Sequence, residues 1–200
     1  MLIVSVASGT LGVSKDGVTL VATTKGIVMY KGGQVLSVVD PGFECQCVTI
    51  DASGKEAWIG DDKGVIHAMS VEGDTLTEIA KLEKHRAAVT CLSVSPDGSM
   101  LASADGMKEV VVWDVVSREV RKSRMVFHTA RVLDIAWAPD GQHLASASLD
   151  TNVIVWPLNS STRFEGKRAH INGAHAVVWT DEKTLASAGA DSMIRLWSVP

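Results

Sequence analysis

The sequence predicts an all-β protein made of repeated four-stranded sheets, and two observations carry this prediction. First, the apolar runs alternate with period two and are rich in β-branched residues, as in "VTCLSV", "VLDIAW" and "NVIVW", which favours pleated strands. No amphipathic helix of a dozen residues can be drawn. Second, strand-ending tryptophans recur: Trp113, Trp156 and Trp197 are 43 and 41 residues apart. One structural unit is therefore repeated along the chain.

Histidines and turn signals follow the same period. His85, His128 and His170 are 43 and 42 residues apart. The segments "SPDG" at 95–98 and "APDG" at 138–141, with a weaker "TDEK" at 180–183, are typical of hairpin corners. Each unit runs from histidine through a strand, a turn, a serine-bearing strand and an aspartate to a strand ending in tryptophan. The period is that of a propeller blade.

Taken in order, the elements form five expected units within one domain, 1–200. The units lie at residues 10–40, 45–82, 85–127, 128–168 and 170–199. The first four each end in an outer strand, contained in "QVLSVVD", "TLTEIAK", "REVRKSRMV" and the region around "STRFEGK". The fifth has no outer strand, whereas "LIVSV" at 2–6 is an outer strand without a unit of its own.

Composition limits the classes of function. With 46% hydrophobic residues the chain can bury a substantial core. A formal charge of −4 and the lack of a basic stripe argue against nucleic-acid binding. Cys45, Cys47 and Cys91 do not have zinc-ligand spacing and are interpreted as reduced, structural thiols. The apolar N-terminal run is too short for a signal or a membrane span, so a cytoplasmic location is expected.

The order of residues in each unit resembles the WD-repeat family of β-propellers. That resemblance implies a hydrogen-bonded chain of four residues per blade, in which indole, hydroxyl, imidazole and carboxylate each satisfy the next. Carried over, it gives His128, Ser146, Asp150 and Trp156 in the fourth unit and His170, Ser187, Asp191 and Trp197 in the fifth. The third unit keeps His85, Ser103 and Trp113, but Met107 replaces the aspartate and Asp105 comes two residues early. In the second unit Ala68 falls at the tryptophan position and Asp62 at the aspartate position.

A closer resemblance covers residues 30 to 199. "VDPGFECQCVTI", "ASADGMKEVVVW" and "AHINGAHAVVWTDEKTLASAGADSMIRLW" are similar, in this order, to the last blades of the actin-interacting protein one family. That family has two joined seven-bladed propellers that assist cofilin in dismantling actin filaments. The resemblance implies about five blades of a seven-bladed propeller, with actin filaments and cofilin as partners. The missing blades would come from the same polypeptide or a second copy; alternatively, the strand at 2–6 closes the chain on itself.

The sequence therefore predicts a cytoskeletal, non-catalytic interaction scaffold without metal or cofactor. A generic WD-repeat scaffold, such as a ubiquitin ligase substrate receptor, is the alternative. The serine, histidine and aspartate resemble a hydrolase triad, but their recurrence in successive units favours a structural role. Asp61 and Asp62 lack further calcium ligands and are interpreted as a solvated turn. Loop residues expected to cluster on one rim are Arg86, Asp105, Lys108, Arg131, Leu149 and Ala190, of which Arg86, Lys108 and Arg131 are the candidate binding residues.

Overall fold

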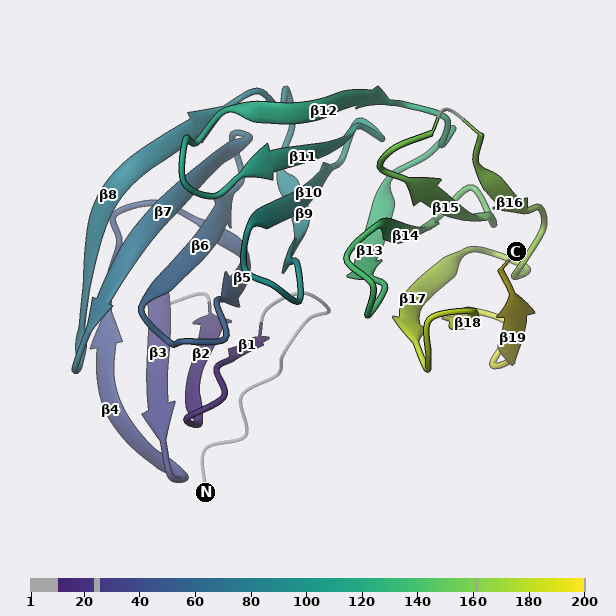
Figure 1. Cartoon of the computed structure of the whole chain (residues 1–200). Helices are drawn as coiled ribbons and strands as arrows, with labels where there is room; N and C mark the ends of the chain where they lie inside the picture. Colours follow the sequence, from purple (N-terminus) through teal and green to yellow (C-terminus); the bar gives the residue numbers. More distant parts are fainter. Residues whose placement is uncertain (1–10, 24–25, 161, 200) are drawn as a thin grey trace. The chain divides into compact units, whose positions relative to one another are not determined.

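The computed structural model describes residues 11–23, 26–160 and 162–199, so the predicted strand at 2–6 lies outside the described residues. The described residues form nineteen strands and no helix, which confirms the all-β class. No helix long and apolar enough to cross a lipid bilayer occurs in this part of the chain. The strands form antiparallel sheets in chain order (Figure 1). Contacts divide the chain into two compact units, Met1–Leu92 and Ser93–Pro200.

The first unit contains two four-stranded sheets. The strands of the first sheet are β1 (Leu11–Val13), β2 (Val18–Thr23), β3 (Gly26–Lys31) and β4 (Gln34–Val39). Those of the second sheet are β5 (Cys45–Ile50), β6 (Glu56–Asp61), β7 (Val65–Glu72) and β8 (Thr75–Glu83). Each strand pairs with its chain neighbour, as in a β-meander.

The core of the first unit lies between these two sheets. Leu20 and Met29 of the first sheet and Ile59 of the second are fully buried in one apolar cluster. The backbones approach closely at Gly12, where an added Cβ atom would lie 2.9 Å from the backbone nitrogen of Ile50. Only glycine fits this contact between β1 and β5.

The second unit contains the remaining strands, and the boundary between the units falls within β9. The third sheet has β9 (Val89–Val94), β10 (Met100–Asp105), β11 (Val110–Asp114) and β12 (Val120–Met125). The fourth has β13 (Val132–Trp137), β14 (His143–Ser148), β15 (Val153–Pro157) and β16 (Phe164–Gly166). The fifth has β17 (Ala174–Trp179), β18 (Thr184–Gly189) and β19 (Ile194–Ser198), and these three strands are all that the described residues place in it.

Side chains of the second unit tie successive sheets together. The indole N–H of Trp137 donates to the carbonyl of Ser93 at 2.9 Å, and that of Trp179 donates to the carbonyl of Ala136 at 3.1 Å. Asp134 accepts the backbone N–H of Val177 at 2.9 Å. Burial raises the pKa of Asp134 to about 6, although this backbone bond acts in the opposite direction. Sequence reasoning treated both tryptophans only as strand residues and missed these ties.

The cysteines have the properties of structural thiols. No disulfide joins Cys45, Cys47 and Cys91. Burial raises the pKa of Cys45 to about 11 and raises that of the fully buried Cys47 as well. Both thiols are therefore protonated at neutral pH and poor nucleophiles.

Candidate functional site

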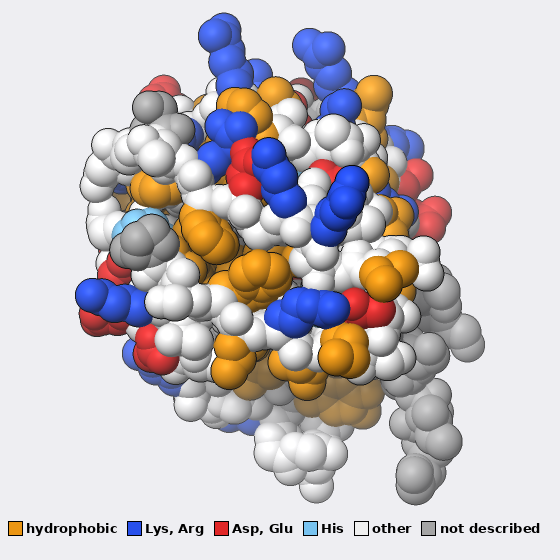
Figure 2. Space-filling model, turned by 90° about the vertical axis from the view of Figure 1, so that its right-hand side faces the viewer, with side chains coloured by type: hydrophobic (Ala, Val, Ile, Leu, Met, Phe, Trp, Pro, Cys, Tyr) orange, Lys and Arg blue, Asp and Glu red, His pale blue; other side chains and the backbone are white. Residues whose placement is uncertain are grey.

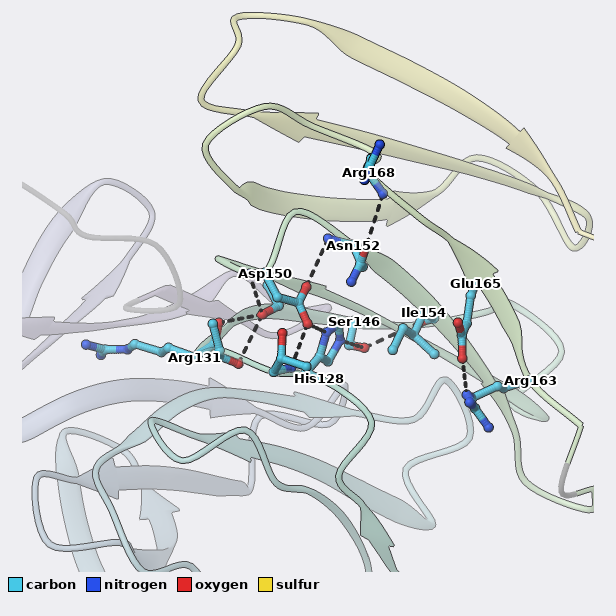
Figure 3. Close-up of polar contacts among 12 residues, drawn as sticks. His128, Arg131, Ser146, Asp150, Asn152, Ile154, Arg163, Glu165 and Arg168 are labelled. Atoms are coloured by element: carbon cyan, nitrogen blue, oxygen red, sulfur yellow. Dashed lines mark hydrogen bonds and ion pairs between the residues drawn. The ribbon is translucent and has the colours of Figure 1, made fainter.

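A chain of four hydrogen-bonded side chains, here called the relay, crosses the fourth sheet. The indole N–H of Trp156 donates to Ser146 Oγ at 2.8 Å, and Ser146 Oγ lies 2.7 Å from His128 Nε2. His128 Nδ1 lies 2.9 Å from Asp150 Oδ2, which also accepts the backbone N–H of Thr129. In Figure 3, His128, Ser146 and Asp150 point toward one another. The structure thus brings together all four residues predicted for this unit.

The direction of each bond follows from what each group can donate. The carboxylate of Asp150 accepts only, so His128 Nδ1 donates to it, while the Ser146 hydroxyl lies 2.7 Å from His128 Nε2 and 3.4 Å from the Ile154 carbonyl. Burial alone would raise the pKa of Asp150, but hydrogen bonds from His128 and from the N–H groups of Thr129 and Asn152 outweigh it and lower the pKa to about 2. The carboxylate of Asp150 is therefore ionised at neutral pH and accepts all of these hydrogen bonds.

The fifth sheet contains a second relay with one additional member. Trp197 Nε1 donates to Ser187 Oγ at 2.8 Å, Ser187 Oγ lies 2.8 Å from His170 Nε2, and His170 Nδ1 lies 2.8 Å from Asp191 Oδ1. Arg195 donates to the other carboxylate oxygen of Asp191 at 2.8 Å. These donors lower the pKa of Asp191, against the effect of burial.

The third sheet keeps the indole–hydroxyl bond of the relay, and the predicted His85 is buried beside the displaced aspartate, with side-chain polar atoms of His85, Asp105 and Glu109 within 4.8 Å of one another. Trp113 Nε1 donates to Ser103 Oγ at 2.8 Å. Asp105, the displaced aspartate, is 1% exposed, and its carboxylate accepts the backbone N–H groups of Met107 and Glu109. The prediction that Asp105 contributes to an exposed rim is therefore wrong, because its side chain is consumed by closing the β10–β11 turn.

The second sheet has a different polar centre, which sequence reasoning missed. His67 on β7 is 4% exposed, and its Nδ1 lies 2.6 Å from Glu78 Oε2 on β8. Its Nε2 lies 3.4 Å from Asp61 Oδ2, and its ring stacks on Phe43 with centroids 3.7 Å apart. Asp61 is 3% exposed and accepts two backbone N–H groups, so its interpretation as part of a solvated turn is wrong. The sequence signal that could have indicated this centre is a histidine within a predicted strand, with an acidic residue in the strand before it and another in the strand after it.

Strand register also corrects the tryptophan position of this sheet. Leu144 pairs with Trp156 in the fourth sheet, and Ala57 pairs with Met69 in the second. Met69, not Ala68, therefore occupies the tryptophan position. A single-residue shift was invisible in the sequence because the strand lacks its own tryptophan.

The relays position loops but present no reactive group at the surface. The exposed fraction of Ser146 is 0% and that of Ser187 is 2%, and each hydroxyl accepts an indole N–H. A serine nucleophile needs an accessible oxygen beside its base. This arrangement instead fixes the turn that follows each serine-bearing strand.

The candidate binding residues lie in exposed turns. Arg86 lies in the segment between β8 and β9 of the first unit. In the second unit Lys108 lies in the β10–β11 turn, and Arg131 directly precedes β13. Figure 3 shows the side chain of Arg131 extending away from the relay of the fourth sheet, while its carbonyl accepts the N–H of Leu149 at 3.0 Å. The relay end of the fourth sheet thus holds Arg131 and the half-exposed Leu149 in adjoining loops.

Apolar side chains are exposed on one face of the fifth sheet. Ile194 is 75% and Leu196 is 69% exposed on β19, and Val178 on β17 is 58% exposed. Figure 2 views the molecule from the side on which β16–β19 lie, and apolar side chains there are surrounded by Lys and Arg side chains. This face is uncovered among the described residues.

Comparison with known protein families matches three segments of the chain. A model of the WD domain, G-beta repeat, matches residues 76–114, 121–157 and 160–198. A chain in a crystal structure of the mitotic checkpoint complex superimposes with a TM-score of 0.84 at 25% identity, covering 98% of this chain and 64% of that chain. The repeats and the superposition confirm the propeller class.

Curated proteins are similar over almost the whole chain. Actin-interacting protein 1-2 of Arabidopsis thaliana is 41% identical over 181 residues, which is 90% of this chain and 30% of that protein. The 66 kDa stress protein of Physarum polycephalum is 36% identical over 98% of this chain and 32% of its own length. Actin-interacting protein 1 of Caenorhabditis elegans is 32% identical over 95% of this chain and 32% of its own length. The chain thus spans about a third of these relatives.

Proposed function

This chain belongs to the WD40-repeat family, and from that premise we propose that it is a non-catalytic scaffold that binds actin filaments and supports their disassembly by cofilin. The observation that carries the proposal is the 41% identity to Actin-interacting protein 1-2 over 90% of the chain. Actin-interacting protein 1 of Caenorhabditis elegans, which is 32% identical over 95% of the chain, supports it further. The proposal places the chain in the cytoplasm, on the cytoskeleton.

The rim of the second unit supports the proposal chemically. Lys108 and Arg131 are exposed, and apolar side chains accompany them, since Met107 is 61% and Ile171 is 68% exposed. A mixed cationic and apolar loop surface on a rigid sheet is suited to protein recognition. The cations would steer an acidic filament, and the apolar groups would supply contact area.

Co-sedimentation with actin filaments, with and without cofilin, tests the proposal. We expect the full chain to pellet with filaments and the triple variant R86A/K108A/R131A to remain largely in the supernatant. The matched control is K15A/K55A/K183A, which removes three exposed charges elsewhere and should pellet like the original chain. Both variants should keep the melting temperature, because none of the six side chains is buried.

Three outcomes would contradict the proposal or a part of it. Absence of pelleting by the original chain would argue against filament binding by this segment and favour a scaffold of another complex, such as a ubiquitin ligase substrate receptor. Equal loss in both triple variants would show that charge alone, rather than the rim, mediates pelleting. If the chain binds filaments but does not speed their shortening by cofilin, the disassembly part of the proposal fails.

A further inference from the structure

Two adjoining cavities lie between β12 of the third sheet and residues 157–160 and Arg163 of the fourth. The first, of about 200 Å³, is lined by Lys122, Ser123, Arg124, Met125, Phe127, Trp156, Pro157, Ser160 and Arg163. The second, of about 280 Å³, is lined by Val112, Arg121, Lys122, Leu158 and Asn159. Lys122 lines both cavities, so they meet at this side chain and are together called the β12 groove. Because β12 is the last strand of its sheet, no further strand of that sheet covers it.

Lys122 fixes the shape of the β12 groove at its centre. Its ammonium donates to the carbonyls of Pro157, Leu158 and Ser160 at 2.6, 3.0 and 3.1 Å. These three bonds hold the 157–160 segment against β12 and use all three donors of the ammonium. The charge itself has no carboxylate partner among the described residues, and burial lowers the pKa of Lys122. The groove is thus prebuilt and positively charged at its middle.

The charges along the β12 groove have one sign. Its lining includes Arg121, Lys122, Arg124 and Arg163 and no carboxylate. Arg121 lies 4.0 Å from Asp114, and Arg163 pairs with Glu165, whereas no carboxylate of the described residues pairs with Arg124. This concentration of positive charge stands out in a chain with a formal charge of −4. Such a surface attracts an acidic ligand and rejects another cationic strand.

An aromatic platform closes one end of the β12 groove. Phe127 is 52% exposed, and the guanidinium of Arg163 lies 3.5 Å from the centroid of its ring. Trp156 of the relay lies behind it, with ring centroids 5.9 Å apart. Met125 is buried beside them. These walls suit an apolar side chain more than a bare inorganic anion.

We propose that the β12 groove binds an extended acidic polypeptide segment, whose carboxylates face Arg121 and Arg124 and whose apolar side chain packs against Phe127. Two neighbouring cavities beside the uncovered β12 can take successive side chains of one extended segment, and the unpaired positive charge selects acidic residues. This inference does not depend on actin binding, because the groove contains none of the rim residues.

Fluorescence anisotropy with a short labelled peptide of alternating glutamate and leucine tests the inference on the full chain. We expect saturable binding that weakens roughly tenfold in the R124E variant and in the F127S variant, since a tenfold change corresponds to about 1.4 kcal/mol. K183E carries the same change of charge on an exposed lysine outside the groove and should bind within about twofold of the original chain. Unchanged melting temperatures would establish that the variants fold.

The peptide and competitor series separates this proposal from simple anion attraction. A matched peptide of alternating glutamine and leucine should bind at least roughly tenfold more weakly, because it lacks the charges. Equal binding of that peptide, equal weakening by K183E, or no binding to the original chain would overturn the inference. Displacement of the acidic peptide by inorganic phosphate at similar concentrations would also overturn it, because the groove would then be an anion site only.

Discussion

The second and the fourth sheets have the same antiparallel meander of four strands, but different groups hold their centres. In the fourth sheet the indole of Trp156 is paired with the hydroxyl of Ser146. In the second sheet, strand register places Met69 at the tryptophan position and Ile59 at the serine position. The donor and its acceptor are thus replaced together. Removing both partners of a buried hydrogen bond is far less costly than removing one, so the pair behaves as a single unit of substitution.

The position that faces the relay serine on the next strand carries most of the variation. It is Ile154 in the fourth sheet, Arg195 in the fifth and His67 in the second. Arg195 extends the relay through Asp191, whereas His67 replaces the relay by bridging two acids. In the second and fifth sheets a polar residue at this position thus joins the network, whereas Ile154 in the fourth sheet and Val111 in the third add no polar side chain there.

The largest expected difference between the two sheets comes from truncating the equivalent side chains Trp156 and Met69. We expect W156A to lower the free energy of unfolding by about 3–5 kcal/mol, because it opens a large cavity and leaves Ser146 without its donor. M69A should cost less, about 2–3 kcal/mol, because only apolar contacts are lost. Equilibrium urea denaturation measures both. A larger loss in M69A than in W156A would contradict the view that the relay adds to packing.

A methyl group at Gly189 should disrupt the relay of the fifth sheet by displacing the ring of His170. A Cβ atom at Gly189 would lie 2.3 Å from Cγ of His170 and 2.6 Å from the carbonyl oxygen of Gly173. We expect G189A to lower the free energy of unfolding by about 3 kcal/mol, since the ring must move. In the double variant G189A/H170A the two effects should be clearly less than additive, as a double-mutant cycle by urea denaturation would measure. Full additivity would argue against a clash with the ring.

The smallest expected effect is a change with pH in the stability that the Asp150 carboxylate gives to the fourth sheet. The pKa of Asp150 is lowered to about 2, below that of an unfolded chain, so its contribution is present above about pH 4 and is lost as pH falls toward 2. We expect the difference in unfolding free energy between the original chain and D150N to shrink by about 2 kcal/mol over that range. A difference that stays constant would mean that the carboxylate is not stabilised by the relay.

The fold class could be predicted because its signals are periodic, and both complete relays could be predicted because the recurring residues resemble the WD-repeat pattern. Tryptophan, serine, histidine and aspartate recur at fixed spacings, and the structure brings each set of four together. The second sheet could not be predicted in the same way. His67, Asp61 and Glu78 belong to three different strands and are not direct cross-strand partners, so only the folded sheet reveals that their side chains meet. The exposed role assigned to Asp105 failed because a turn can bury a carboxylate by donating backbone N–H groups to it.

Trp179 and Val177 of β17 complete hydrogen bonds that begin in the fourth sheet, at Ala136 and Asp134. During synthesis the fourth sheet leaves the ribosome before β17 does, so water hydrates the carboxylate of Asp134 until the N–H of Val177 replaces it. Until β17 arrives, the fourth sheet also lacks the indole of Trp179 that bonds to Ala136. The fourth and fifth sheets should therefore reach their final packing in one cooperative step on the nascent chain, although each is a separate meander.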